Sequence, residues 1–193
     1  MIFTATALPG VFIVDIERKE DPRGFFARIA CNDEFAAQGL SFRPVQASIS
    51  WNPRRGTLRG LHYQAAPHVE AKIVRCTAGA IYDVVLDLRS NSPTCGLWAG
   101  VELSAENRRS LFIPEGLAHG FQTLQDYSEV YYQMSTRYVP SAARGVRWND
   151  PTIGIVWPLP EIAFLSSTDS SLPDLATALS RERHDMISQN DAQ

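Results

Sequence analysis

The sequence has little of what metal-binding, nucleic-acid-binding or membrane proteins require. Its three cysteines (Cys31, Cys76 and Cys95) are far apart and form no Cys-x-x-Cys pair, so neither a disulfide framework nor a zinc site is expected. A formal net charge of −3 at pH 7 provides no general basic surface for nucleic acid. There is no run of about 18 apolar residues, and the first ten residues lack the charged and apolar regions of a signal peptide. These absences predict a cytoplasmic protein whose partners include neither nucleic acid nor a membrane.

With 193 residues, the chain is long enough for one domain, and because 45% of these residues are apolar it can bury a sizeable core. Short β-forming runs separated by Gly, Pro, Asn or Asp recur along it, which is typical of an all-β sandwich or barrel. We expect this domain over residues 1–173 and a partly frayed helical tail over 174–193, its helix running from Leu172 to about Met186. A short helix is expected over Asn32–Gly39, capped by Asn32 and ended by Gly39. The expected strands are Val11–Glu17, Phe25–Ala30, Val45–Trp51, Thr57–Gln64, Lys72–Thr77, Ala80–Arg89, Trp98–Leu103, Ser110–Ile113, Gly120–Leu124 and Glu129–Thr136.

Residues 81–89 show the strand alternation most clearly. Tyr82, Val84, Leu86 and Leu88 share one face, and the other face carries Asp83, Val85, Asp87 and Arg89. The apolar face suits a core. The polar face lies either on the wet exterior or along an internal pocket, and periodicity leaves both possibilities open.

Two histidines lie in strand-like segments that could carry chemistry. Alternation puts His62 on one face with Leu58, Gly60 and Gln64, and Gly60 leaves room beside it. A Pro–Gly turn delivers His119 onto a later strand. A single histidine on a strand is more often structural than catalytic.

Other polar groups occur in apolar strands, where a structural role is the simpler interpretation. Lys72 precedes two aliphatic residues, and such a lysine usually extends its ammonium to solvent. Tyr131 and Tyr132 sit in an apolar, aromatic strand, where a buried tyrosine pair is ordinarily part of the core.

The segment Pro114-x-Gly116-x-x-His119 resembles the second sequence motif of the cupins. The first cupin motif supplies metal ligands as His-x-His followed by Glu, whereas here His62 is followed two residues later by Gln64. Only His62 and His119 are available as ligands, which is too few for a metal site. We therefore expect a cupin-type double-stranded β-helix (jelly roll) without metal, in which both histidines act as acid–base groups.

From about Asp21 to Pro173, the chain resembles the dTDP-4-dehydrorhamnose 3,5-epimerases. The joint order and spacing of the landmarks carries this resemblance. They are Asp21-Pro22-Arg23-Gly24-Phe25-Phe26, Leu58-Arg59-Gly60-Leu61-His62-Tyr63-Gln64, Lys72-Ile73-Val74, residues 83–89, Ser92-Pro93-Thr94, Leu103-Ser104-Ala105-Glu106-Asn107, residues 113–121, Trp148-Asn149-Asp150-Pro151, Trp157-Pro158 and Leu165-Ser166-Ser167-Thr168-Asp169.

The resemblance implies a cofactor-independent isomerase that acts on a nucleotide-diphosphate sugar with a ketone at C4. That ketone acidifies the protons on C3 and C5, and inversion needs a base, an acid on the opposite face and a group that stabilises the enolate. By resemblance, His62 is the base and Asp169 orients it. Tyr132 is the acid, and Lys72 lies near the C4 oxygen, which reverses the simpler interpretation of that lysine.

Further residues match substrate-binding positions of the family. His119 and Asp83 match a second dyad that shapes the sugar site, and Arg59 matches a contact to the sugar or the diphosphate. Tyr138 matches an aromatic position close to the substrate. The family's homodimers pass N-terminal residues into the partner's nucleotide pocket; Arg23 matches a phosphate contact and Phe26 a base contact, although simple core packing would also explain Phe26.

Three departures from the family pattern lie on the nucleotide side. Arg28 stands where the family usually has a Glu that reads the base, and Thr168 stands where a Lys is common. The family's Gln-Asp-Asn is Gln46-Ala47-Ser48 here, so an amide becomes a hydroxyl. Because Arg offers donors where Glu offers acceptors, we hypothesise a different nucleotide or a rearranged dTDP-sugar.

Several other functions remain as alternatives. Relatives with the same acid–base residues epimerise only C3 or only C5, and the choice depends on how the sugar lies against His62. A 3,4-ketoisomerase of similar fold, a metal-dependent cupin oxygenase and a non-catalytic sugar-binding protein are the others. The combination of His62, Lys72, Tyr132 and Asp169 argues against the ketoisomerase, and the presence of His62 and Tyr132 argues against the non-catalytic protein. Metal analysis of the purified protein would distinguish the oxygenase.

Overall fold

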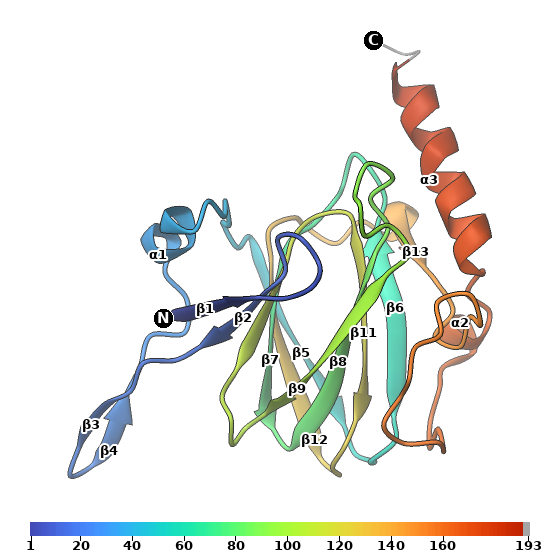
Figure 1. Ribbon diagram of the computed structural model, residues 1–193. Coiled ribbons are helices and arrows are strands. Elements are labelled where there is room, and N and C mark those ends of the chain that lie inside the picture. Colours follow the sequence, from blue (N-terminus) through green and yellow to red (C-terminus); the bar gives the residue numbers. More distant parts are fainter. Residues whose placement is uncertain (191–193) are drawn as a thin grey trace.

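The computed structural model describes residues 1–190, with side chains as far as residue 183. Two antiparallel sheets face each other, and a long helix stands apart from them at the C-terminal end (Figure 1). The strands are β1 (Ile2–Ala5), β2 (Phe12–Asp15), β3 (Lys19–Asp21), β4 (Gly24–Phe26), β5 (Gln46–Asn52), β6 (Leu58–Gln64), β7 (Lys72–Ala78), β8 (Ala80–Asp87), β9 (Trp98–Ser104), β10 (Ser110–Ile113), β11 (Leu117–Thr123), β12 (Ser128–Met134) and β13 (Ala143–Gly145). The helices are α1 (Asn32–Ala37), α2 (Ser167–Ser170) and α3 (Leu175–Asn190), with a 3₁₀ turn at Pro140–Ala142.

The strand order confirms the expected jelly roll. One sheet runs β1-β2-β10-β7-β12-β5 and the other β13-β6-β11-β8-β9, so strands distant in sequence are neighbours in both. Residues such as Val74, Val85, Leu111 and Phe121 fill the space between the sheets. The hairpin of β3 and β4 forms a separate two-stranded ribbon that projects away from both sheets (Figure 1).

Both faces of β8 are buried, so its polar face does not lie on the wet exterior, one of the two positions that the sequence left open. Val84, Leu86 and Leu88 pack outside the five-stranded sheet, against a layer from the C-terminal part of the chain that includes Ile153 and Leu175. Asp83 and Asp87 therefore point between the sheets, where each is fully buried. The polar face lines the interior of the jelly roll.

Several expected boundaries differ from the structure. The cap predicted at Asn32 is wrong: Cys31 precedes the first helical residue, and no side chain caps this end of α1. Gly39 follows the helix as expected, with φ of +73° and its N–H donating to the carbonyl oxygen of Ala36. The strand expected over Phe25–Ala30 covers only Gly24–Phe26. Strands β1, β3 and β13 and helix α2 were not predicted.

The C-terminal helix begins later and extends further than predicted. It starts at Leu175 because Asp174 caps it: the Asp174 carboxylate accepts a hydrogen bond from the Thr177 N–H at 2.8 Å. It continues to Asn190, beyond the expected end near Met186. The prediction of fraying falls partly on residues 191–193, which lie outside the described part of the chain.

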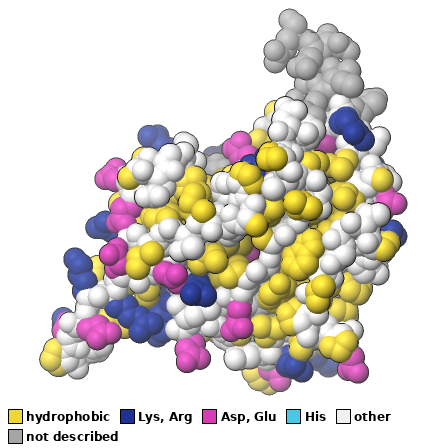
Figure 2. Space-filling view, viewed as in Figure 1, with side chains coloured by type: hydrophobic (Ala, Val, Ile, Leu, Met, Phe, Trp, Pro, Cys, Tyr) yellow, Lys and Arg dark blue, Asp and Glu magenta, His cyan; other side chains and the backbone are white. Residues whose placement is uncertain are grey.

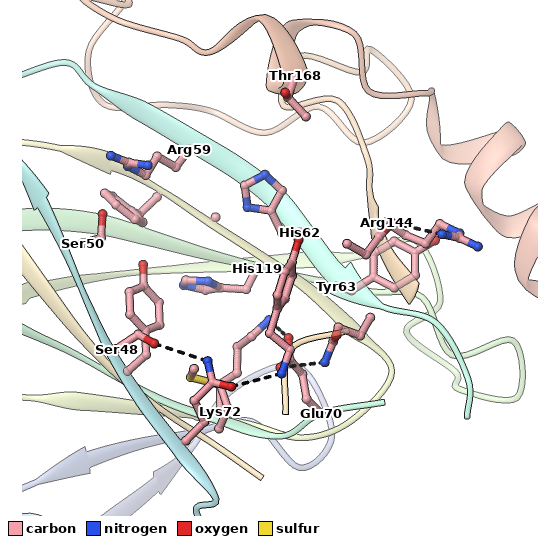
Figure 3. A pocket seen from close by; sticks show the side chains of 18 of the residues that line it. Ser48, Ser50, Arg59, His62, Tyr63, Glu70, Lys72, His119, Arg144 and Thr168 are labelled. Atoms are coloured by element: carbon pink, nitrogen blue, oxygen red, sulfur yellow. Dashed lines mark hydrogen bonds and ion pairs between the residues drawn. The ribbon is translucent and has the colours of Figure 1, made fainter. Parts of the chain in front are cut away.

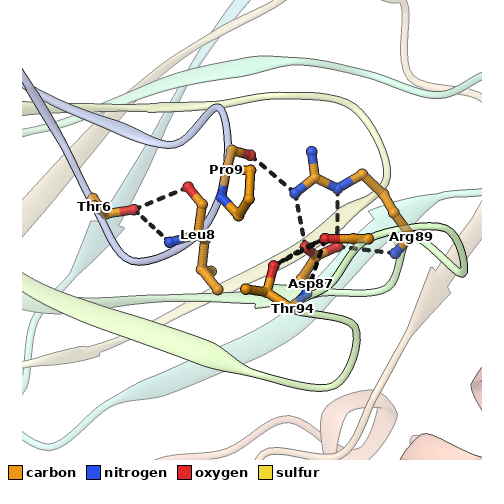
Figure 4. Close-up of polar contacts among 7 residues, drawn as sticks. Thr6, Leu8, Pro9, Asp87, Arg89 and Thr94 are labelled. Atoms are coloured by element: carbon orange, nitrogen blue, oxygen red, sulfur yellow. Dashed lines mark hydrogen bonds and ion pairs between the residues drawn. The ribbon is translucent and has the colours of Figure 1, made fainter.

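A buried carboxylate joins the end of β8 to the N-terminal loop (Figure 4). Asp87 accepts hydrogen bonds from Arg89 (Nη2 at 2.7 Å), Ser92 (Oγ at 2.6 Å) and Thr94 (Oγ1 at 2.7 Å). Arg89 Nη2 also donates to the carbonyl oxygen of Pro9 at 2.9 Å. Burial by itself raises the pKa of Asp87, but these hydrogen bonds outweigh it and lower the pKa to about 2.

We expect Asp87→Asn to destabilise the fold at neutral pH by about 2 kcal/mol, the free energy that corresponds to this pKa difference. Because the folded-state pKa is depressed, the stabilisation is present above the ordinary pKa near 4 and is lost as the pH falls toward about 2. Urea unfolding at pH 7 and at pH 3 measures it, with Glu115→Gln on the exposed surface as the control. A wild-type advantage of equal size at both pH values would contradict this assignment.

Candidate active site

One cavity of about 520 Å³ opens between the two sheets (Figure 3). Strands of both sheets, the loop after β12 and helix α2 contribute its walls. Its lining includes nine of the residues singled out from the sequence, namely Gln46, Ser48, Arg59, His62, Lys72, His119, Tyr132, Tyr138 and Thr168. The structure thus brings residues from distant parts of the chain into one site.

A bulge in β6 turns two of these side chains toward the cavity. Opposite β11, His62 pairs with His119 but Arg59 pairs with Phe121, so β6 has one residue more than its partner. Arg59 and His62 therefore both line the cavity, and the simple alternation predicted for this strand is wrong. Gly60 permits the bulge: it has φ of +112°, and a Cβ there would lie 2.7 Å from the Gly120 Cα. The space predicted beside His62 is occupied by the β11 backbone.

His62 and Asp169 form the first dyad of the site. His62 Nε2 lies 2.6 Å from Asp169 Oδ1, and the Gly60 N–H donates to Oδ2 at 3.3 Å. Burial raises the pKa of Asp169, but the His62 hydrogen bond and the charge of that ring outweigh it and lower the pKa. An ionised carboxylate only accepts, so Nε2 carries a proton, and Nδ1 has a free lone pair whenever the ring holds no second proton. With its side chain 48% exposed, His62 is accessible to a ligand.

His119 and Asp83 form a second, deeper dyad. His119 Nε2 lies 2.8 Å from Asp83 Oδ2, and both side chains are buried. Burial raises the pKa of Asp83, against the opposing charge of His119. Asp83 Oδ1 has no hydrogen-bond partner within the described residues, so His119 is the main support of this carboxylate.

Tyr132 lies against this second dyad. Its ring meets the His119 ring edge-on, with centroids 5.9 Å apart. Burial and the nearby charge of Asp83 raise the pKa of Tyr132, so its hydroxyl stays protonated at neutral pH and can donate a proton. Tyr132 packs against the core, as the simpler interpretation expected, and it also lines the cavity.

Lys72 pairs with a carboxylate that sequence reasoning did not select. Its Nζ lies 2.8 Å from Glu70 Oε1, and each side chain is only 11% exposed, so Lys72 does not extend into bulk solvent. Gln64 fixes the other carboxylate oxygen, its Nε2 donating to Glu70 Oε2 at 3.2 Å. The only signal in the sequence was the presence of Glu70 two residues before the lysine.

Another part of the wall consists of polar groups without a charge partner. Arg59 Nε donates to Asn52 Oδ1 at 2.8 Å, and no ion pair of Arg59 is found within the described chain. Gln46 Oε1 accepts from the Tyr138 N–H at 3.1 Å, and Gln46 Nε2 lies 3.5 Å from Ser48 Oγ. These groups offer an anion a guanidinium and several hydrogen-bond donors.

Three predicted binding residues lie on or beside the projecting hairpin and do not reach the cavity of their own chain. Phe26 is 75% exposed. Arg23 pairs with Asp21, and Arg28 pairs with Glu34 at 2.6 Å. Figure 2 shows this projection extending from the body at the lower left, with both charged and apolar side chains on it. Of the three departures on the nucleotide side, Ser48 and Thr168 line the cavity and Arg28 does not.

The described residues contain no group of three or more His, Cys, Asp and Glu side chains arranged to hold a metal ion. His62 and His119 are instead each bonded to a carboxylate of their own. Within the same part of the chain, no helix is both long and apolar enough to cross a membrane.

Comparison with known proteins assigns the chain to a family. The family model for dTDP-4-dehydrorhamnose 3,5-epimerase matches residues 5–177. The chain belongs to the dTDP-4-dehydrorhamnose 3,5-epimerase family. A relative of that name from Salmonella typhimurium is 43% identical over 183 residues, which are 94% of this chain and all of the relative. This confirms the resemblance found in the sequence.

Solved structures of epimerases share the fold. The crystal structure of dTDP-4-dehydrorhamnose 3,5-epimerase from Elizabethkingia anophelis has a TM-score of 0.89 and 36% identity, covering 92% of this chain and 97% of its own. A 3′-monoepimerase from Streptomyces bikiniensis, solved with dTDP-quinovose, has a TM-score of 0.84 and 32% identity and covers 97% of both chains. The same fold thus occurs in an enzyme named as a 3,5-epimerase, which refers to two carbon atoms, and in one named as a monoepimerase, which refers to one.

Proposed function

We propose that this epimerase inverts C3 and C5 of a dTDP-linked 4-keto-6-deoxyglucose through enolate intermediates, with His62 as base and Tyr132 as acid. One observation carries the proposal: an oriented histidine with a free Nδ1 and a neutral tyrosine line the same cavity. The C4 ketone acidifies each neighbouring C–H. His62 Nδ1 removes the proton, and Asp169 stabilises the imidazolium that forms. Tyr132 then delivers a proton to the other face of the enolate.

The Lys72 ammonium stabilises the negative charge that develops on the C4 oxygen, and the residues paired around it hold it in place. An ammonium held at a fixed place in a cavity stabilises an enolate without having to reorganise during the reaction. Glu70 and Gln64 hold Lys72 in this way. Arg59 offers its planar guanidinium to the diphosphate.

Proton NMR of dTDP-4-keto-6-deoxyglucose incubated with the enzyme in D2O tests the proposal. We expect deuterium to enter at both C3 and C5, because each proton is exchanged with solvent through the enzyme's acid and base. Entry at a single carbon would replace the proposal with a monoepimerase. No entry at either carbon, together with exchange of the same sugar carried on UDP, CDP or GDP, would retain the chemistry and correct the nucleotide.

We propose that the enzyme acts as a homodimer in which each projecting hairpin supplies Arg23 and Phe26 to the partner's cavity. The exposed aromatic ring of Phe26 and the exposed apolar side chains of Ile49 and Trp51 on edge strand β5 support this. Mixing two inactive variants, His62→Ala and Arg23→Ala, should restore activity, since mixed dimers then contain one cavity with both residues intact. Mixtures as inactive as their components would contradict the exchange of hairpins.

We also propose a cytoplasmic location. The cysteines Cys31, Cys76 and Cys95 are all free thiols, which suits a reducing compartment. Fractionation of the cells that produce the protein, followed by detection with an antibody, is the direct test.

A further inference from the structure

The buried carboxylate of Asp150 lies outside the cavity, in the segment Trp148-Asn149-Asp150-Pro151. Asp150 Oδ1 accepts hydrogen bonds from Thr152, from its N–H at 2.8 Å and from its Oγ1 at 2.6 Å. Asp150 Oδ2 accepts from the Leu175 N–H at 2.7 Å. The carboxylate therefore bonds its own turn with one oxygen and the C-terminal segment with the other.

Leu175 is the first residue of α3, where a backbone N–H has no partner inside the helix. Asp174 caps the Thr177 N–H, and the Leu175 N–H donates to Asp150, so this hydrogen bond joins the helix end to the body beside the packing of the Leu175 side chain. Nearby contacts strengthen the anchor. The Arg147 N–H donates to the Pro173 carbonyl oxygen at 2.9 Å, and a Cβ on Gly145 would lie 2.7 Å from Leu172 Cδ2, so this leucine packs directly on the backbone.

This anchor lies just beyond the residue that orients the base. Asp169 belongs to α2, a helix of only four residues that cannot hold its own position. Before α2, the Phe164 carbonyl oxygen accepts the Leu58 N–H of β6 at 3.0 Å. After α2, the next fixed points are Leu172, which packs on Gly145, then Pro173, which bonds Arg147, and Leu175, which bonds Asp150. The segment that carries Asp169 is thus attached to the body on both sides, and the Asp150 carboxylate makes the last hydrogen bond of the attachment that follows it.

We propose that Asp150 is a positioning residue for the epimerase: by binding the first N–H of α3, it holds the segment that presents Asp169 to His62. The inference rests on the proposed catalytic role of His62 and Asp169. Asp150 touches neither the cavity nor the dyad, and it acts through the peptide chain between Asp169 and Leu175. A shift of about an ångström in Asp169 is enough to impair catalysis, because His62 must be closely oriented toward the proton that it removes.

A pair of variants at Leu175 isolates the hydrogen bond. Leu175→Pro removes the N–H, and proline is well tolerated at the first position of a helix. Leu175→Ala keeps the N–H and loses the same packing of the leucine side chain. We expect Leu175→Pro to lower kcat about tenfold relative to Leu175→Ala with a smaller change in KM, since most of the cavity wall lies on strands that Leu175→Pro leaves in place.

A spectroscopic readout separates positioning from a general loss of structure. In proton NMR, the His62 Nε2–H bonded to Asp169 should give a downfield signal that Asp169→Asn abolishes. That signal should broaden or vanish in Leu175→Pro and in Asp150→Ala, and persist in Leu175→Ala. The double variant Asp150→Ala/Leu175→Pro should be no worse than Asp150→Ala alone, because Asp150→Ala has already removed the acceptor of the Leu175 N–H.

Equal kcat and an equal His62 signal in Leu175→Pro and Leu175→Ala would overturn the positioning role. Undiminished activity in Asp169→Asn would instead remove the proposed role of the dyad. The two failures are therefore distinguishable in the same set of proteins.

Discussion

Replacing His62 with alanine should lower kcat by about 10²- to 10⁴-fold, the range that general-base catalysis supplies. Deuterium should then enter neither C3 nor C5, because one base serves both positions and the described cavity holds no second histidine with a free, exposed ring nitrogen. His119 is buried and bonded to Asp83, so it cannot take over. Proton NMR in D2O measures the exchange, and a coupled assay measures the turnover.

The matched control is His68→Ala. His68 lies in the loop between β6 and β7 and is not among the residues that line the cavity. The His68→Ala variant should therefore keep kcat within about twofold of the wild type, because substitutions away from special contacts usually change stability little and this one leaves the cavity intact. If His62→Ala still exchanges deuterium at the wild-type rate, another group is the base and the assignment fails.

Tyr132→Phe should separate proton removal from inversion. The variant keeps His62 and Lys72, so enolate formation continues and deuterium enters the recovered starting sugar. Conversion to the epimer should fall by about 10²-fold or more, because phenylalanine has no proton to give to the opposite face. Burial raises the pKa of Tyr132, so the tyrosine should remain a proton donor throughout the neutral and mildly alkaline range.

Tyr131→Phe is the control for this variant. Tyr131 neighbours Tyr132 on β12 but is not part of the cavity wall, and its hydroxyl accepts from Gln133 Nε2 at 3.3 Å. Loss of a single hydroxyl there should leave both exchange and conversion near wild-type values. Parallel losses of exchange and conversion in Tyr132→Phe would show that the tyrosine is needed before the enolate forms.

The chain's short-range pattern was sufficient for most of the fold. Alternation in residues 81–89 predicted β8 and placed Asp83 and Asp87 together, but it could not tell the interior from the exterior. That choice depends on the C-terminal layer, whose Ile153 and Leu175 cover the other face. A short strand such as β13 was missed because its pairing partner, rather than its own three residues, defines it.

The site was predicted mainly through family resemblance. The features of the site that the sequence analysis missed show why local patterns were not enough. Glu70 lies in a loop with no periodicity, so its contact with Lys72 arises only from folding. The β6 bulge that brings Arg59 beside His62 depends on how closely Gly60 and Gly120 approach across two strands. No local pattern encodes such a contact, since the residues concerned lie some sixty positions apart.

The two members of the proposed base dyad are 107 residues apart in the chain. During synthesis, His62, Lys72 and Tyr132 all leave the ribosome before Asp169 does, so a jelly roll that closes early does so without its oriented base. A nascent or prematurely terminated chain can hold most of the cavity wall and still lack the carboxylate. Turnover therefore reports that translation has passed Asp169, well after the strands that form most of the cavity wall.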